Sequence, residues 1–170
     1  MQRDDNRYRK LYYLGFWRFV WCDTFKGMVV IQRRVDGSTS FNRSWSEYRD
    51  GFGDVSGDHW LGLETLAEMT GNSQYFLIVE PLTNPHSDIL YSSIFSFRMS
   101  FRGTSSGSLS GAAFSRSNNT GFSTYDRDHD RWSNGSCAIA NGGGWWYNDC
   151  DVWANLNGPW QSRSNGGIYW

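Results

Sequence analysis

Three aspartates alternate near the C-terminal end of the sequence, at Asp126, Asp128 and Asp130. Calcium in proteins takes oxygen ligands from carboxylates and backbone carbonyls together, so a loop that curls around one centre could direct these carboxylates at a single ion. The spacing matches the first three ligand positions of an EF-hand loop, but the sixth position is arginine and the twelfth is cysteine, which breaks the match. Two interpretations remain open: a calcium loop of another kind, completed by carbonyls near residues 132–134, or a solvated acidic turn.

The sequence holds three cysteines, which allow at most one internal disulfide. Cys137 and Cys150 are near enough in sequence to close a short loop, and such a bridge stabilises a protein by about 3 kcal/mol. The stretch between them is rich in glycine and polar turn residues, so a covalent link would fix an otherwise flexible segment. The alternative is a pair of buried, reduced thiols. We favour the disulfide and therefore a secreted protein, with Cys22 left unpaired.

Three N-glycosylation patterns point to the same compartment. They begin at Asn42, Asn118 and Asn134, and each has the form Asn-X-Ser or Asn-X-Thr. A single occurrence often arises by chance. Together with the cysteines, the patterns indicate an extracellular glycoprotein.

Enzymatic, nucleic-acid-binding and membrane-spanning functions have little support in the sequence. The three histidines, His59, His86 and His129, are scattered, and none belongs to a metal-ligand or nucleophile pattern. The net charge of -1 argues against a broad basic surface for nucleic acid. The apolar run at residues 11–21 carries an arginine and is too short to insert into a membrane, because a spanning helix takes about 18 or more apolar residues. We therefore expect a non-enzymatic recognition domain.

The elements that must position these residues follow from local patterns. A β-branched run predicts a strand at residues 28–35, followed by a turn at Asp36-Gly37. The predicted elements after this turn are a helical turn at 46–50, a helix at Leu63–Thr70 capped by Gly71, a strand at Tyr75–Val79 and a strand in the second half of 89–101. We expect residues 1–10 to be frayed and residues 103–124 to be loops. The order of elements indicates an α+β domain, and its many aromatic residues indicate a core built on rings.

Five blocks of the sequence resemble the fibrinogen C-terminal-like domain family, which includes ficolins, tachylectins, angiopoietins, tenascins and the fibrinogen chains. The blocks are residues 29–38, 41–70, 122–130, 143–150 and 155–158, in family order and spacing. The resemblance covers residues 22–170 and leaves residues 1–21 as a poorly matching segment. It implies a globular domain with a mixed, mainly antiparallel sheet, short helices and a loop-rich, calcium-binding C-terminal lobe. It also implies a chain truncated at both ends, without the last strands, from an oligomeric parent in which Cys22 would have an upstream partner.

The resemblance implies a calcium site and a disulfide in the C-terminal lobe. The implied metal ligands are the carboxylates of Asp128 and Asp130 and the backbone carbonyls of Trp132 and Asn134. Asp126 would not be a ligand, although it belongs to the same alternating pattern. Members of the family also pair the cysteines that match Cys137 and Cys150. They often have a cis peptide bond before the second one, here the bond between Asp149 and Cys150.

A recognition pocket beside the calcium site is the last feature that the resemblance implies. Lectin members hold acetyl groups there, with a histidine after the second cysteine and tyrosines around it. This sequence has Asp151 in place of that histidine and Asn141 where some acetyl binders carry tyrosine. An apolar methyl pocket edged with charged and polar groups would hold an acetyl group poorly. The expected pocket residues are Asn141, Tyr147, Asp149, Cys150, Asp151, Ser164 and Asn165.

Two functions follow from the resemblance. The first is a secreted, calcium-dependent domain that binds carbohydrate or acetylated ligands in a defence-type, innate-immune role. The alternative is a receptor-binding or extracellular-matrix adhesion module that contacts cell-surface or matrix proteins. The altered pocket residues favour the alternative, whereas the fold and the calcium site suit either function.

Overall fold

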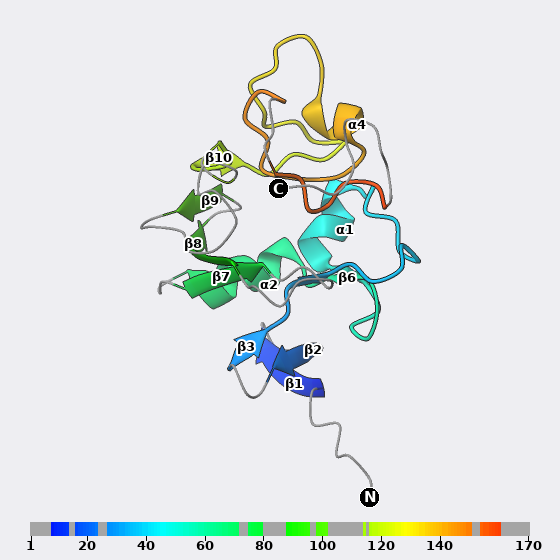
Figure 1. Ribbon diagram of the computed structural model, residues 1–170, viewed down its shortest axis with the longest axis vertical. Coiled ribbons are helices and arrows are strands. Elements are labelled where there is room, and N and C mark those ends of the chain that lie inside the picture. The colour runs from blue at the N-terminus through cyan, green and yellow to red at the C-terminus, as the bar shows by residue number, and fades with distance from the viewer. Residues whose placement is uncertain are drawn as a thin grey trace, which may run out of the picture.

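The computed structural model describes residues 8–13, 16–23, 27–71, 75–79, 88–95, 98–101, 114, 116–150 and 154–160. Within these ranges the strands form three antiparallel sheets and the helices are short, which confirms the α+β architecture. Figure 1 shows the sheet nearest the N-terminus at one end of the molecule, with the acidic loop and the last helix at the opposite end. None of the helices in these ranges has the length and apolarity that a membrane crossing requires.

The first sheet has the order β1-β2-β3 and consists of β1 (Tyr8–Tyr13), β2 (Phe16–Asp23) and β3 (Met28–Val29). β1 and β2 form a hairpin in which Tyr8 lies opposite Trp21 and Tyr13 lies opposite Phe16. The frayed end expected at residues 1–10 is therefore wrong for its last residues, because all of β1 pairs with β2. Residues 1–7 lie outside the described ranges.

The second sheet has the order β4-β6-β5 and consists of β4 (Gln32–Arg33), β5 (Phe52–Gly53) and β6 (His59–Trp60). The single strand predicted at 28–35 is wrong, because β3 and β4 belong to different sheets. The chain changes partner between them. The N–H of Val30 donates to the carbonyl of Trp21, whereas the carbonyl of Ile31 accepts from the N–H of Leu61. A continuous β-branched run carries no sign of such a change.

Helix α1 (Trp45–Asp50) begins with a capping box, in which the Ser44 hydroxyl accepts from the N–H of Glu47 and the Glu47 carboxylate accepts from the N–H of Ser44. The helix ends at Gly51, whose φ of 94° lies in the region that favours glycine. The helical turn predicted at 46–50 is confirmed, and it starts one residue earlier than predicted.

Helix α2 (Leu63–Thr70) has the bounds that its apolar spacing predicts, and it buries Leu63 and Leu66 against the core. Gly71 occupies the C-cap position as expected. Its backbone is right-handed (φ -55°, ψ -30°) rather than left-handed, so it does not supply the usual glycine cap.

The third sheet has the order β10-β9-β8-β7 and consists of β7 (Tyr75–Val79), β8 (Asp88–Phe95), β9 (Arg98–Phe101) and β10 (Thr120–Gly121). The predicted strand at 75–79 is confirmed. The strand predicted in the second half of 89–101 is wrong, because this segment holds two antiparallel strands in which Phe95 lies opposite Arg98. The pairing of β10 with β9 brings the segment before the acidic loop into this sheet.

A cluster of buried aromatic rings joins the sheets to the C-terminal lobe, as the composition predicts. The ring of Phe122 lies 4.8 Å from that of Trp146, 4.9 Å from that of Tyr48 and 6.2 Å from that of Trp60, measured between centroids. All four side chains are at most 3% exposed. Because a Cβ added at Gly144 would lie 2.6 Å from the Tyr48 ring, glycine at this position permits the close approach of the lobe.

The segment 154–160 is held against β4. Gln32 donates through Nε2 to the carbonyl of Leu156 at 2.8 Å, and Arg34 donates to the carbonyl of Gly158 at 2.9 Å. The Arg34 guanidinium also lies 3.9 Å from the ring centroid of Phe41, and burial lowers its pKa. These contacts connect the N-terminal third of the chain to the lobe that carries the acidic loop.

Candidate functional site

The first aspartate of the alternating set is bound to helix α1. The Oδ1 of Asp126 accepts from the backbone N–H of Trp45 at 2.8 Å and from the hydroxyl of Thr124 at 2.7 Å. The Trp45 ring contacts two residues of the same loop. The Arg127 guanidinium is 4.5 Å from the centroid of the Trp45 ring. The centroid of the His129 ring is 5.3 Å from the same point, in an edge-to-face arrangement. The loop is therefore anchored to the first turn of α1 by residues that stand outside the implied ligand set.

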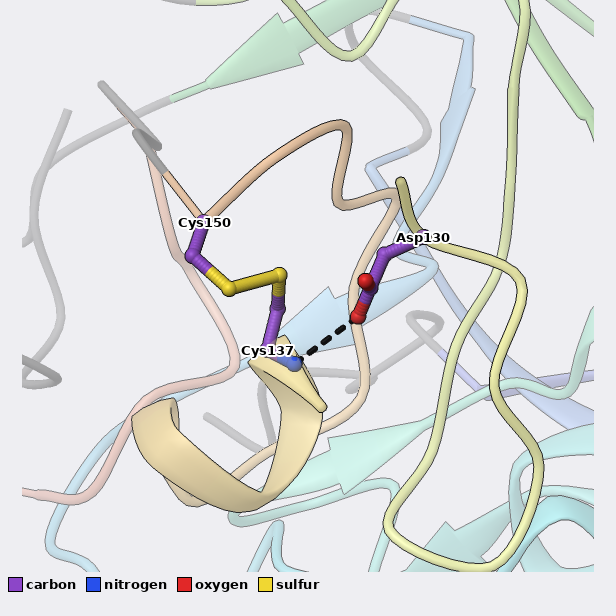
Figure 2. A group of neighbouring side chains, drawn as sticks. All are labelled: Asp130, Cys137 and Cys150. Carbon is purple, nitrogen blue, oxygen red and sulfur yellow. Dashed lines mark hydrogen bonds between the residues drawn. A yellow bond between two sulfur atoms is a disulfide. The ribbon is translucent and has the colours of Figure 1, made fainter. Parts of the chain in front are cut away.

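The other two aspartates organise the loop itself. Asp128 is exposed, and its Oδ1 accepts from the N–H of Asp130 at 2.9 Å. The partly buried carboxylate of Asp130 accepts twice, from the N–H of Trp132 and from the N–H of Cys137, both at 2.8 Å. Cys137 is the first residue of helix α4 (Cys137–Asn141). Asp130 thus ties the acidic loop to the start of this helix (Figure 2).

The pKa of the Asp130 carboxyl is raised above its ordinary value. Burial is the largest cause, and the neighbouring Asp128 carboxyl adds to it, whereas the N–H groups of Cys137 and Trp132 oppose it. Burial and the neighbouring Asp128 carboxyl therefore disfavour the ionised form of Asp130. A divalent cation would supply compensating positive charge, and the donor atoms are the oxygens that calcium prefers. The assignment of Asp128 and Asp130 as calcium ligands stays a prediction.

The two carbonyls of the implied ligand set lie in a turn. The carbonyl of Trp132 accepts from the N–H of Gly135 at 3.3 Å, and the side chains of Trp132 and Asn134 are exposed. A carbonyl oxygen has a second lone pair, so this long hydrogen bond leaves Trp132 able to bind a cation. The assignment of both carbonyls stays a prediction.

A disulfide joins Cys137 to Cys150, with their Cα atoms 5.0 Å apart. This confirms the expected pair. Asp130 offers an oxygen within 4.8 Å of both sulfur atoms, but the sulfurs are bonded to each other and are not available as thiolate ligands. Cys22 is a free, partly buried cysteine on β2, opposite Val29.

The backbone before Cys150 differs from the expectation. The described residues contain no cis peptide bond, so the expected cis bond between Asp149 and Cys150 is wrong. Cys150 instead has a φ of 61°, in the left-handed region.

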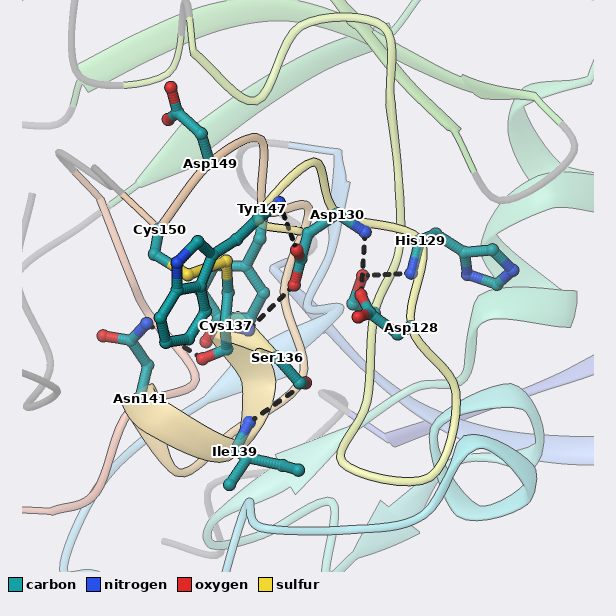
Figure 3. Close-up of a disulfide and its surroundings, with 12 residues drawn as sticks. Asp128, His129, Asp130, Ser136, Cys137, Ile139, Asn141, Tyr147, Asp149 and Cys150 are labelled. Atoms are coloured by element: carbon teal, nitrogen blue, oxygen red, sulfur yellow. Dashed lines mark hydrogen bonds between the residues drawn. A yellow bond between two sulfur atoms is a disulfide. The ribbon is translucent and has the colours of Figure 1, made fainter. Parts of the chain in front are cut away.

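Two of the expected pocket residues are buried beside the disulfide (Figure 3). Asn141 donates through Nδ2 to the carbonyl of Cys137 at 2.9 Å, and the hydroxyl of Tyr147 donates to the carbonyl of Gly143 at 2.8 Å. Each bonded group contacts the chain itself instead of facing outward. The pocket that they would line stays a prediction.

A third expected pocket residue, Asp149, is exposed. Its carboxylate lies 3.9 Å from the Arg116 guanidinium, and the two side chains are 49% and 36% exposed. An ion pair of this length and exposure contributes little to stability. The remaining expected residues, Asp151, Ser164 and Asn165, lie outside the described ranges.

All three glycosylation candidates, Asn42, Asn118 and Asn134, are exposed. The sequence alone did not reveal two features of the site. It assigned no role to Asp126 once the resemblance had excluded it as a ligand, and it did not find Arg116. Neither partner could be found from spacing, because Asp126 binds a residue 81 positions away and Arg116 lies in a Gly- and Ser-rich stretch without periodicity.

Comparisons with known proteins extend over most of the chain. The family model described as the C-terminal globular domain of fibrinogen beta and gamma chains matches residues 17–170. Human angiopoietin-related protein 2 is 39% identical over 167 residues, which span 89% of this chain and 33% of that protein. The chain therefore spans about a third of the length of this curated relative.

Two solved structures resemble the fold. The fibrinogen-like globe domain of human ANGPTL2 superposes with a TM-score of 0.83 at 32% identity, over 96% of this chain and 82% of that chain. Lamprey fibrin D-dimer, solved with the peptide ligand Gly-His-Arg-Pro-amide, has a TM-score of 0.74 at 29% identity. That alignment covers 87% of this chain and 53% of that chain.

Proposed function

The chain belongs to the fibrinogen C-terminal domain family, whose matched members are extracellular and non-enzymatic, and we propose that it binds proteins by recognising a basic peptide segment. The observation that carries this proposal is a difference in exposure among the expected pocket residues. Asn141 and Tyr147 are buried and bonded within the chain, whereas Asp149 presents an exposed carboxylate. Such an arrangement suits a cationic group better than a sugar hydroxyl or an acetyl group.

The chemistry of the neighbouring residues supports a cationic ligand. Among the residues that the structure describes, Asp149 forms a long, exposed ion pair with Arg116, and Asp151 follows Cys150 in the sequence. A peptide amine or guanidinium that displaced Arg116 would gain a charge-assisted hydrogen bond. The lamprey fibrin fragment was solved with a peptide that carries such groups, Gly-His-Arg-Pro-amide. This likeness supports the choice of a basic peptide for the present chain.

We further propose that calcium supports the site. Asp128 and Asp130 would hold the ion with their carboxylates, and the carbonyls of Trp132 and Asn134 would add to them. When bound, calcium would neutralise the two carboxylates and fix the loop. Fixing Asp130 would also fix the start of α4 next to the disulfide, because the Asp130 carboxylate accepts a hydrogen bond from the N–H of Cys137.

Carbohydrate binding is the second candidate function and has less support. The acetyl pocket of lectin members lacks its histidine here, since Asp151 stands in that place. The matched relatives reported above are angiopoietin-related and fibrinogen proteins. We therefore give the protein-binding function precedence over a defence-type lectin.

A fluorescence titration tests the proposal. The chain holds 10 tryptophans, so intrinsic emission can report binding. Gly-His-Arg-Pro-amide, its N-acetylated form and N-acetylglucosamine would each be titrated in calcium. We expect saturable binding of the free peptide, weaker binding of the acetylated peptide because it lacks the terminal charge, and no saturation with the sugar. Saturation with the sugar alone would overturn the proposal in favour of the lectin.

A matched pair of variants locates the site. Asp149→Asn removes the exposed carboxylate, and we expect it to weaken peptide binding by about 0.5–1 kcal/mol, as for one exposed charge pair. Glu68→Gln makes the same change of charge on the exposed face of α2 and is expected to leave binding unchanged. Equal losses in both variants would show a general effect of net charge instead of a site at Asp149.

A further inference from the structure

The turn that follows the acidic loop carries the sequence Trp-Ser-Asn-Gly-Ser at residues 132–136. Its third residue, Asn134, is exposed and is followed by Gly135 and Ser136, which completes an acceptor pattern for N-linked glycosylation. The carbonyl of Trp132 accepts from the N–H of Gly135, so the asparagine stands near the tip of a closed turn. An extracellular protein passes through the compartment in which such asparagines receive sugars.

The ring of Trp132 lies over the residue that follows this asparagine. A Cβ added at Gly135 would lie 2.7 Å from Cζ3 of Trp132, so the ring lies over the residue next to Asn134. The side chain of Trp132 is nevertheless 39% exposed, which leaves apolar surface in contact with solvent. Sugar rings present C–H groups on one face, and these pack well on the electron-rich face of an aromatic ring.

We propose that Asn134 carries an N-linked glycan whose first sugar packs on the ring of Trp132. In the attachment reaction the amide nitrogen of Asn134 bonds to C1 of a lipid-linked oligosaccharide. The bond from C1 to the lipid pyrophosphate breaks, and the amide loses one proton. This inference is independent of the peptide-binding proposal, because it depends on the amide side chain and the ring alone.

The two other acceptor asparagines provide an internal comparison. The residue two positions before Asn42 is Ser40, and the residue two positions before Asn118 is Arg116. Neither offers an aromatic face at the spacing that Trp132 has from Asn134. A glycan at either position would lack the ring support that distinguishes the turn at 132–136.

Mass spectrometry of the secreted chain tests the modification. The chain would be expressed in mammalian cells behind a cleavable secretion signal, and the glycans would be released with an amidase in heavy-oxygen water. We expect Asn134 to become aspartate with one heavy oxygen when the amidase is present, and not in a matched sample kept in heavy-oxygen water without the amidase. An unmodified Asn134 in the secreted protein would overturn the proposal. Aspartate without heavy oxygen, present before and after treatment, would also overturn it, because exposed Asn-Gly sequences deamidate spontaneously.

Trimming the glycan tests the packing on Trp132. An endoglycosidase that leaves only the first N-acetylglucosamine is expected to preserve the Tm of the glycosylated protein, whereas the amidase, which removes every sugar, lowers the Tm. In Trp132→Ala the two treatments are expected to give the same Tm. Tyr125→Ala, which removes another exposed ring outside the acceptor pattern, should behave as the unaltered chain. Equal Tm values for the two treatments in the unaltered chain would overturn the packing.

Discussion

The carboxylate of Asp126 accepts a hydrogen bond of 2.8 Å from the backbone N–H of Trp45, which is 81 positions earlier in the chain and is the first residue of α1. Together with the contact that Asp130 makes, it attaches the acidic loop at two separate places. Asp126 binds the loop to α1, and Asp130 binds it to α4. Asp128, which is exposed between them, is therefore held in place by its neighbours on both sides.

Asp126→Ala should destabilise the protein without abolishing its response to calcium. The change removes the acceptor for the Trp45 N–H and the Thr124 hydroxyl, and we expect a loss of about 1 kcal/mol in the free energy of unfolding. Asp126→Asn keeps an acceptor oxygen and should lose less. Thermal unfolding with and without calcium measures both effects. If Asp126→Ala removed the calcium-induced rise in Tm, Asp126 would itself belong to the ligand set.

Asp128→Asn combined with Asp130→Asn should abolish the stabilisation by calcium. For the unaltered chain, calcium at about 100-fold above its dissociation constant would add about 2.7 kcal/mol to the free energy of unfolding. The double variant lacks both carboxylates, so its Tm should be the same in calcium and in chelator. Asp126→Asn is the control, because it makes the same kind of substitution in the same loop at a residue outside the proposed ligand set. A rise in Tm that survives in the double variant would contradict the proposed ligands.

The stability of calcium-free protein should fall as pH rises through the pKa of Asp130. Burial and Asp128 raise the pKa of this carboxyl in the folded state, so the folded state binds more protons than the unfolded chain between about pH 4 and the raised value. Stability therefore declines with rising pH across that window and is constant above it. Hydrogen bonds with Ser44 lower the pKa of Glu47. The contribution of Glu47 to the stability of the folded protein therefore rises with pH, opposite to that of Asp130.

The contribution of Asp130 must consequently be measured as a difference. Subtracting the Tm profile of Asp130→Asn from that of the unaltered chain should leave a descending curve in chelator. In calcium the same difference should rise with pH, because the ion favours the ionised carboxylate. Identical difference curves under the two conditions would show that no cation binds beside Asp130.

Tyr48→Phe should be costly although it removes a single oxygen atom. The buried hydroxyl donates to the carbonyl of Phe41 at 2.6 Å and accepts from the N–H of Gly144 at 3.1 Å. Burial raises the pKa of Tyr48, so the group stays protonated and can donate. Two buried backbone groups would lose their partner, and we expect a loss of about 2–4 kcal/mol. Tyr75→Phe, at an exposed position on β7, is the matched control and should change stability little. Chemical denaturation measures the free energy of unfolding of both variants.

Local patterns predicted the elements whose cause is local. Helix α2 follows from apolar spacing within eight residues, and β7 follows from a short run of apolar residues. The errors arose where partners are distant. The run at 28–35 divides because Val30 binds Trp21 while Ile31 binds Leu61, and no property of the run itself reveals those partners.

The site was predicted to a similar extent and for similar reasons. The disulfide between Cys137 and Cys150 could be inferred from spacing and composition, and the resemblance supported it. The burial of Asn141 and Tyr147 could not, since it depends on the packing of the whole lobe. The bond between Asp149 and Cys150 also differs from the cis bond that the resemblance implies, because local backbone geometry is set by contacts that a motif does not specify.

The hydrogen bond from Gly144 to Tyr48 has a consequence for biosynthesis. The two residues are 96 positions apart. Phe122, which packs on Tyr48, and Trp146, which packs on Trp60, are also made late. At about 5–20 residues per second, the ribosome exposes Tyr48 on the order of 5–20 s before its partners emerge. Nascent chains therefore carry an uncovered aromatic surface for that interval. This aromatic surface is covered only after Phe122, Gly144 and Trp146 have been made and have packed against the earlier residues.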